Sequence, residues 1–232
     1  MTASRTIRSM ELADAAADFV RTRAAAVASR CLNGLHVPGF VCGHPTGPSE
    51  RADLAYVISH LAQLGDDAFA GAPADRAVAE ALHDIDGPAT DTFYSYRVAE
   101  SLLAFGPRQS NPVLQAVGDR QRENLFVACD STAIYDPATD TLPGRPNNYW
   151  GVLARCEFAR KRLALAHDED LLERCIARVH RALGASERGF FDDSNDLTGR
   201  YDIYSADVLL FLEPLWDLLD RDRMIRALAT HV

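Results

Sequence analysis

The sequence has no long hydrophobic run. No stretch approaches the roughly 18 consecutive apolar residues that a membrane-spanning helix requires. The opening segment, Met1 to Arg5, is not followed by an apolar segment of signal-peptide length. These absences predict a protein with no membrane segment, no membrane partner and a cytoplasmic location.

Basic charge is also scarce, because 24 Lys and Arg residues stand against 33 Asp and Glu residues and leave a net charge of −9. An acidic surface repels phosphate backbones, so we expect no nucleic-acid partner. The one dense basic cluster consists of Arg155, Arg160, Lys161 and Arg162, and it shares a predicted helix with Glu157. This mixture of charges predicts a solvated helix face.

The sequence contains cysteines, but their number and spacing do not indicate disulfide pairs. The five cysteines are odd in number and widely spaced, which favours reduced thiols over a disulfide framework. Cys42-Gly43-His44 has no second Cys/His pair at zinc spacing. The sequence also lacks the common nucleotide-binding, serine-hydrolase and zinc-protease motifs. We therefore expect no metal and no cofactor.

Alternating β-branched runs are nearly absent, whereas Ala and Leu dominate, so the composition predicts an all-α fold in one domain over residues 1–232. Gly65 is expected to stop one helix and Gly106-Pro107 another. The predicted helices cover residues 10–31, 49–64, 74–85, 91–105, a segment from 112, 147–166, 168–184, 202–219 and 221–230.

A weak internal repeat begins near residue 92 and continues past residue 204. Tyr94, Tyr149 and Tyr204 are separated by 55 residues each, and an aliphatic residue follows four positions after each one: Val98, Leu153 and Val208. A 55-residue unit holds two helices, so the repeat predicts an array of helical hairpins, as in α/α toroids. A closed ring of six hairpins needs roughly 330 residues. We therefore expect an incomplete or small toroid, with a second copy or a partner domain completing the array.

Aromatic and polar residues open three of these helices. In a toroid, the N-terminal ends of alternate helices surround a cavity. This predicts a substrate-binding set of Tyr94, Tyr96, Asn147, Asn148, Tyr149, Trp150, Asp192 and Arg200. The alternative is that these residues are helix caps and core aromatics.

The acidic segment that follows Gly189-Phe190-Phe191 contains the motif Asp192-Asp193-x-x-Asp196. It is similar to the magnesium and diphosphate motif of class I terpene cyclases, because magnesium prefers carboxylate oxygens. Two features oppose that function: the motif lies in a predicted loop, and no second magnesium motif follows it. A cyclase remains an alternative.

Residues 147–216 resemble helical-toroid carbohydrate-active proteins, a group of glycosidase-like and polysaccharide-lyase-like proteins. The resemblance rests on the start Asn147-Asn148-Tyr149-Trp150, the acidic aromatic segment 189–196 and the helix start Tyr201-Asp202-Ile203-Tyr204. It implies an enzyme, a hydrolase or a lyase, that acts on a small saccharide-like molecule. The rival hypothesis is a non-catalytic helical-repeat module that binds another protein.

Each implied chemistry has its own candidate residues. In a lyase, Tyr201 or Tyr204 would take the proton beside a uronate carboxylate, and Asn147, Asn148 and Arg200 would stabilise the enolate. The histidine that such lyases usually add has no counterpart near these motifs. In a hydrolase, two carboxylates would act as acid and base, chosen from Asp192, Asp193, Asp202 and Asp207. The expected catalytic residues are Tyr201, Asp202, Tyr204 and Asp193.

Overall fold

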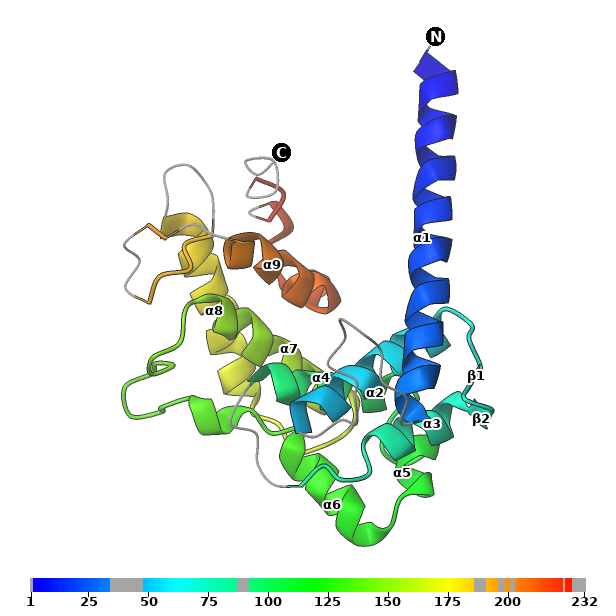
Figure 1. The fold of residues 1–232 in the computed structure, drawn as a ribbon. Helices are drawn as coiled ribbons and strands as arrows, with labels where there is room; N and C mark the ends of the chain where they lie inside the picture. Colours follow the sequence, from blue (N-terminus) through cyan, green and yellow to red (C-terminus); the bar gives the residue numbers. More distant parts are fainter. Residues whose placement is uncertain are drawn as a thin grey trace.

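Helices dominate the computed structural model, which describes residues 2–33, 48–86, 92–185, 191–195, 199–200, 203–222 and 224–226 (Figure 1). The all-α class is therefore confirmed. The α-helices are α1 (Thr2–Leu32), α2 (Pro48–Gln63), α3 (Ala74–Ala81), α4 (Thr92–Leu103), α5 (Pro112–Ala116), α6 (Asp119–Ala128), α7 (Asn148–Arg162), α8 (Glu169–Ala185) and α9 (Ile203–Leu212). Short 3-10 turns cover Thr132–Ile134 and Glu213–Leu218.

Glycine and asparagine set several helix ends, as their chemistry predicts. Gly65 follows α2 with a φ of 95°, a left-handed conformation that costs glycine little. The side chain of Asn111 caps α5 by accepting a hydrogen bond from the Leu114 amide at 3.2 Å. The predicted end of α7 at Ala166 is wrong, because the helix closes at Arg162 and Ala164 adopts a φ of 59°.

A two-stranded hairpin between α2 and α3 was not expected from the sequence. Strands β1 (Ala68–Phe69) and β2 (Ala72–Pro73) are antiparallel, with Ala68 opposite Pro73 and Phe69 opposite Ala72. Positive φ angles at Ala70 and Gly71 make the tight turn. The hairpin places Phe69 in the core with 1% of its surface exposed.

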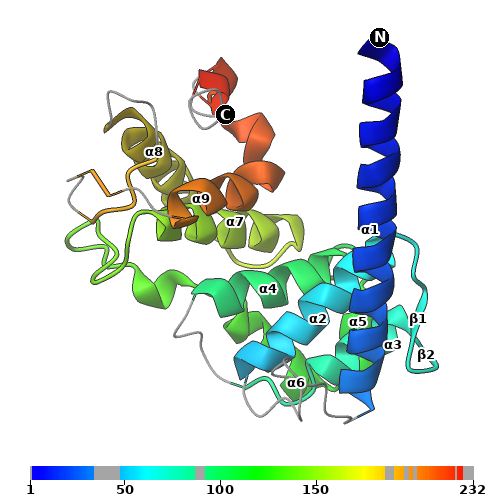
Figure 2. The ribbon, with the colours of Figure 1, turned by 45° about the horizontal axis from the view of Figure 1, so that its top comes forward.

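The helices pack as successive hairpins. Helices α2, α4, α7 and α9 lie side by side in chain order, and α3, α6 and α8 pack against α2, α4 and α7 respectively (Figure 2). This is the order expected of an α/α-hairpin array. Among the described helices, neighbouring helices pack on one another in an open series from α1 to α9. Closure of this series into a toroid stays a prediction.

The 55-residue repeat has a direct structural counterpart. Arg155 of α7 donates hydrogen bonds to Glu100 of α4 and to the carbonyl oxygen of Leu210 of α9, each 55 residues away. It also donates to the hydroxyl of Tyr56 in α2, 99 residues away. Residues at equivalent positions in the repeat therefore meet at one level across α4, α7 and α9, and Tyr56 of α2 joins them from outside the repeat.

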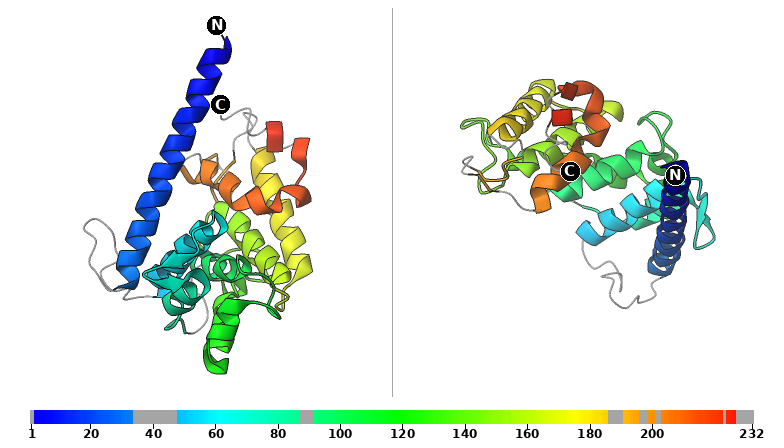
Figure 3. Two further views of the ribbon diagram at one scale, coloured as in Figure 1. Left: turned by 90° about the vertical axis from the view of Figure 1, so that its right-hand side faces the viewer. Right: turned by 90° about the horizontal axis from the view of Figure 1, so that it is seen from above.

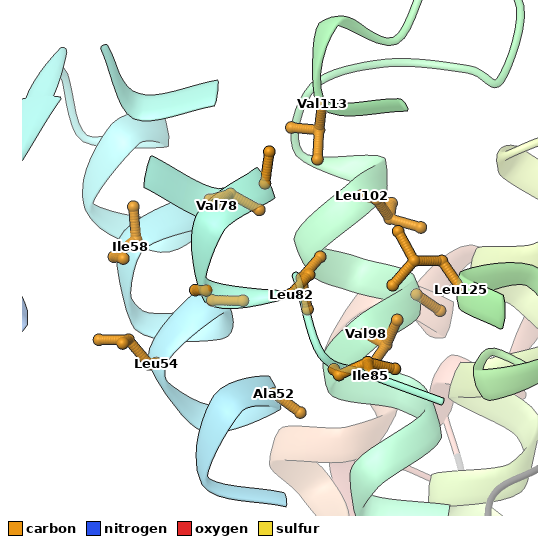
Figure 4. Close-up of a cluster of buried hydrophobic side chains, with 14 of the residues drawn as sticks. Ala52, Leu54, Ile58, Val78, Leu82, Ile85, Val98, Leu102, Val113 and Leu125 are labelled. Carbon is orange, nitrogen blue, oxygen red and sulfur yellow. The ribbon is translucent and has the colours of Figure 1, made fainter. Parts of the chain in front are cut away.

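Buried apolar side chains form two large clusters in the described part of the chain. The first joins α2 to α6, and Figure 4 shows its centre, where Ile58, Val78, Leu82 and Leu102 converge. The second lies among α7, α8, α9 and the turn after α9. Helix α7 contributes to both, because Leu153 belongs to the second cluster and Ala159, nearer its C-terminal end, belongs to the first. The aliphatic residues four positions after the repeated tyrosines are fully buried in these clusters.

The predicted solvated face of α7 is wrong in part. Arg155 and Arg160 are each only 8% exposed, whereas Lys161 and Arg162 are exposed. Glu157 is completely buried and accepts hydrogen bonds from Arg160 at 2.5 Å and from the Asp168 amide at 2.9 Å. Both arginines are buried because each has carboxylate partners on the same or a neighbouring helix.

Helix α1 differs from the other helices. Its C-terminal half packs on α2, whereas its N-terminal half extends away from the other helices, as the views in Figures 1 and 3 agree. No described helix combines the length and the apolarity needed to cross a membrane.

Candidate functional site

The structure brings four of the predicted site residues together at the start of α7. The carboxylate of Asp193 accepts a hydrogen bond from the Asn148 amide at 2.7 Å and so caps the helix. The side-chain amide of Asn147 donates to the carbonyl oxygen of Asp192 at 2.9 Å and to that of Ser194. These contacts attach the acidic segment 191–195 to the N-terminal end of α7.

The carboxylate of Asp192 fixes the conformation of the acidic segment. Its carboxylate accepts hydrogen bonds from the amide of Ser194 at 2.9 Å, the hydroxyl of Ser194 at 2.6 Å, the amide of Gly199 at 2.7 Å and the amide of Arg200 at 3.1 Å. Burial raises the pKa of Asp192, but these hydrogen bonds outweigh that effect and lower it overall. The group is therefore an ionised structural acceptor in this geometry.

This geometry leaves Asp192 little capacity to coordinate the magnesium ion that the cyclase alternative requires. The oxygens of Asp192 already accept four hydrogen bonds, and Asp196 lies outside the described residues. Within the described ranges, no group of three or more His, Cys, Asp or Glu side chains is placed to hold a metal ion. Magnesium binding at this motif stays a prediction.

A pocket of about 350 Å³ opens beside the same helix start. It lies between the loop before α7, the first turn of α7, one face of α8 and the acidic segment. Three arginines and one aspartate are its charged residues. Its lining consists of Asp140, Thr141, Leu142, Pro143, Gly144, Arg145, Asn147, Trp150, Arg178, Arg181 and Asn195. In a chain of net charge −9 this is a locally basic cavity.

One wall of this arginine pocket is rigidly built. Arg178 forms an ion pair with the Asp140 carboxylate, donates to the Asp140 carbonyl oxygen at 2.8 Å and stands over the Trp150 ring at 5.5 Å. The Tyr135 hydroxyl donates to Asp140 at 3.0 Å. Burial raises the pKa of Asp140, but the hydrogen bonds from Arg178 and Tyr135 lower it overall. The guanidinium of Arg178 is thus fixed in place.

The other two arginines of the pocket, Arg145 and Arg181, have different surroundings. Arg145 lies over the Tyr149 ring at 5.1 Å, with its Nη1 3.4 Å from the tyrosine hydroxyl. Arg181 follows Arg178 by three residues on α8 and is exposed. Because residues three apart share a helix face, both α8 arginines line the pocket. Such a cluster can hold a carboxylate, phosphate or sulfate group.

The remaining predicted site residues lie elsewhere. Tyr94 is buried in the first core cluster, and Tyr96 is buried between Tyr56 and Phe211. Tyr204 is 47% exposed on α9. Arg200 is exposed, and Tyr201 and Asp202 lie outside the described residues. Of the predicted set, only Asn147 and Trp150 line the pocket.

Sequence reasoning missed the arginines of the pocket. A signal for them was available, because Arg174, Arg178 and Arg181 follow the spacing of one helix face. That spacing alone does not show which loop packs against α8. The contact between Arg178 and Asp140 joins residues that are 38 positions apart in the sequence.

The cysteines of the described residues are consistent with the expected reduced thiols. Cys31, Cys129, Cys156 and Cys175 are free and buried. Burial raises the pKa of Cys129 to about 12. A thiol with so high a pKa is a poor nucleophile at neutral pH.

Comparison with known proteins adds no assignment, since no protein-family model, no curated protein and no solved structure matches this chain. The arginine pocket, and the predicted residues that line it, are the basis of the functional argument.

Proposed function

We propose that this protein binds a small anionic, saccharide-like molecule in the arginine pocket and acts on it as an enzyme. The observation that carries the proposal is the convergence of Arg145, Arg178 and Arg181 beside Trp150 in an otherwise acidic protein. The volume of about 350 Å³ lies at the lower end of the range for small-molecule sites.

Each part of the lining matches one part of such a ligand. Arginine forks bind carboxylate or phosphate oxygens through two parallel hydrogen bonds. The side-chain oxygen of Asn147 offers an acceptor for a hydroxyl group, the side-chain amide of Asn195 offers donors and an acceptor, and Trp150 supplies an aromatic surface. A negatively charged sugar, such as a uronate or a sugar phosphate, has all three kinds of group.

Of the two chemistries implied by the resemblance, the arginine lining favours elimination. A lyase must neutralise a substrate carboxylate as the adjacent proton leaves, and arginines do that. Hydrolysis needs two opposed carboxylates, whereas Asp192 and Asp193 accept hydrogen bonds from backbone amides. In this proposal Tyr201 remains the candidate base, since Tyr204 does not line the pocket. The cytoplasm is the proposed location, since buried free thiols suit a reducing compartment.

Binding is tested by calorimetry with glucuronate, glucose 1-phosphate and neutral glucose. We expect the anionic sugars to bind and glucose to bind at least tenfold more weakly. The substitution Arg181→Gln should weaken anion binding about tenfold, because a charge-assisted hydrogen bond contributes about 1.5 kcal/mol or more. Arg120→Gln is the matched control, since Arg120 is exposed on α6 and lies outside the pocket lining.

Two results would count against the proposal. One is equal affinity for glucose and for its anionic relatives. The other is an equal loss of anion affinity in Arg181→Gln and Arg120→Gln, which would indicate non-specific charge attraction. Elimination is tested separately by the absorbance of the unsaturated product, using any uronate oligomer that binds.

A further inference from the structure

Asp140 is the acidic residue in the described lining of the arginine pocket, where Arg145, Arg178 and Arg181 are the basic ones. Burial raises the pKa of Asp140, but hydrogen bonds lower it overall, so the carboxylate is charged at neutral pH. Three guanidinium charges and one carboxylate charge leave the described lining with two net positive charges.

A tight turn places Asp140 at the pocket. The turn is closed by a bridge between Asp136 and Thr141, whose backbones exchange hydrogen bonds of 2.9 and 3.3 Å. The Asp136 carboxylate also accepts hydrogen bonds from the Ala138 amide at 2.9 Å and the Thr139 hydroxyl at 2.8 Å. Asp140 has a φ of 51°, a left-handed conformation that among non-glycine residues suits Asp and Asn best. The turn therefore fixes where this carboxylate lies.

The contacts of Asp140 determine which positive charge it neutralises. Arg178 donates to its carboxylate and, at 2.8 Å, to its backbone carbonyl oxygen. The hydroxyl of Tyr135 donates to the same carboxylate at 3.0 Å. Arg174 is 3.9 Å from Asp140 and also 3.9 Å from Asp168, so it is shared between two carboxylates. Arg178 is therefore the main partner of Asp140, and its charge is balanced within the protein.

The net charge of the lining indicates the charge of the ligand that fits it. A ligand that displaces water from a charged site binds best when its own charge is opposite and equal. One carboxylate would balance one of the two net charges, whereas two anionic groups would balance both. The nearby Asp192 and Asp193 lie outside the lining, and backbone amides donate hydrogen bonds to both of them.

We propose that Asp140 sets the charge specificity of the arginine pocket, so that the pocket selects a saccharide with two negative charges. This inference rests on the proposed function and narrows its substrate class. Two kinds of molecule have the required charge: a sugar with one phosphate monoester, and a saccharide with carboxylates on two rings. The second kind also supplies the carboxylate that elimination requires.

Calorimetry on the full-length protein at about pH 8, where a phosphate monoester carries close to two charges, tests the number of charges. The ligands are glucose, glucuronate, glucose 1-phosphate and glucuronate 1-phosphate, which carry about zero, one, two and three negative charges. We expect glucose 1-phosphate to bind at least about fivefold more tightly than glucuronate, and the third charge to add less than about twofold. A disaccharide of two glucuronates, measured beside glucose 1-phosphate, shows which kind of dianion is preferred.

Asp140→Asn tests the role of the carboxylate itself. Asparagine tolerates the left-handed turn and keeps an oxygen acceptor for Tyr135, but it removes the charge. In this variant the third ligand charge should strengthen binding at least about threefold, because a third lining charge is then unbalanced. Asp66→Asn is the matched control, since Asp66 pairs with Arg21 at 2.7 Å outside the pocket lining. Circular dichroism verifies that both variants are folded.

The outcomes separate this inference from the proposed function. Glucose binding as tightly as every anion would contradict the proposed function. Anions that bind more tightly than glucose, but with equal affinity for one and two charges, would overturn only the charge specificity. The role of Asp140 would be overturned by the same charge dependence in Asp140→Asn as in the wild type, or by an equal change in Asp66→Asn. The comparison of ligands on the wild type is decisive for the charge number without either variant.

Discussion

Arg155 shows how a charged side chain can organise a helical interior. It forms a two-pronged ion pair with Glu100, and its Nη1 donates to the Leu210 carbonyl oxygen at 3.0 Å. The Arg155 and Glu100 side chains are only 9% and 11% exposed. Burial lowers the pKa of Arg155, but the hydrogen bond and charge of Glu100 raise it overall, so the arginine stays charged. A charge in this position depends on all of its partners.

Removing the arginine alone should therefore be costly. We expect Arg155→Met to lower the free energy of unfolding by about 3 to 5 kcal/mol, because it leaves Glu100 buried without a counter-charge. Replacing both residues, as Arg155→Met with Glu100→Leu, should recover much of that loss. Urea unfolding of the wild type, both single variants and the double variant measures the coupling.

Lys161→Met is the control for this cycle. Lys161 pairs with Glu169 at 2.7 Å, but the two side chains are 44% and 47% exposed, so the expected change is within about 0.5 kcal/mol. Equal changes in the free energy of unfolding for Arg155→Met and Lys161→Met would show that the buried ion pair stabilises the fold no more than the exposed one.

The burial of Arg155 was not predicted, because its charge was grouped with that of Arg160, Lys161 and Arg162, which follow it on the same helix. Charge composition cannot distinguish a solvated arginine from a paired one. The 55-residue repeat held the missing information, since it places Glu100, Arg155 and Leu210 at equivalent positions on successive helices. Opposite charges at equivalent positions of neighbouring repeats predict a contact.

At the scale of elements, two helices end in the same motif with different residues. After α2, the amide of Asp66 donates to the Leu61 carbonyl at 3.0 Å and that of Gly65 to Ala62 at 2.9 Å. After α7, the Leu165 amide donates to Arg160 at 3.0 Å and the Ala164 amide to Lys161 at 3.1 Å. Both are Schellman motifs, and the pivotal residue has a positive φ in each.

Exchanging the pivotal residues should have opposite effects. Ala164→Gly should raise the free energy of unfolding by about 1 kcal/mol, because glycine adopts a left-handed conformation without strain. Gly65→Ala should lower it by a similar amount. Thermal and urea unfolding measure both effects, and each variant is the control for the other. A change of the same sign in the free energy of unfolding of both variants would contradict the explanation.

The helices were largely predictable because apolar periodicity, proline and glycine act locally. The C-terminal end of α7 was not, since an alanine gives no stop signal, and the carboxylate that caps its start belongs to Asp193, 45 residues after Asn148. The candidate site was found only in part for the same reason. Asn147 and Trp150 belong to a helix start visible in the sequence, whereas Arg178 and Arg181 reach the pocket by tertiary packing.

At the scale of the whole molecule, several carboxylates bind protons less readily in the folded state. The pKa of Asp66 is lowered chiefly by its hydrogen bond from Arg21. The pKa values of Asp140 and Asp192 are lowered by hydrogen bonds that outweigh the effect of burial. Burial raises the pKa of Glu157, so that group acts in the opposite direction.

The three aspartates predict how stability depends on pH. Their lowered pKa values stabilise the fold fully above the unfolded value of about 3.9, and this stabilisation is lost as the pH falls through the folded values. We expect urea midpoints to be nearly constant from about pH 5 to 7 and to drop below about pH 4. In Asp192→Asn the drop should be shallower, from a lower starting stability. An unchanged acid profile in that variant would contradict the role assigned to Asp192.

The position of helix α7 between the two apolar clusters has a consequence for how the molecule unfolds. Trp150, Leu153 and Ala154 belong to one apolar cluster and Ala159 belongs to the other, so this single helix is shared by both cores. Neither core can open alone without breaking this helix at its centre, where Arg155 joins α4 to α9. We therefore expect the slowest-exchanging backbone amides to lie in the middle of α7, and the two clusters to lose protection together as one cooperative unit.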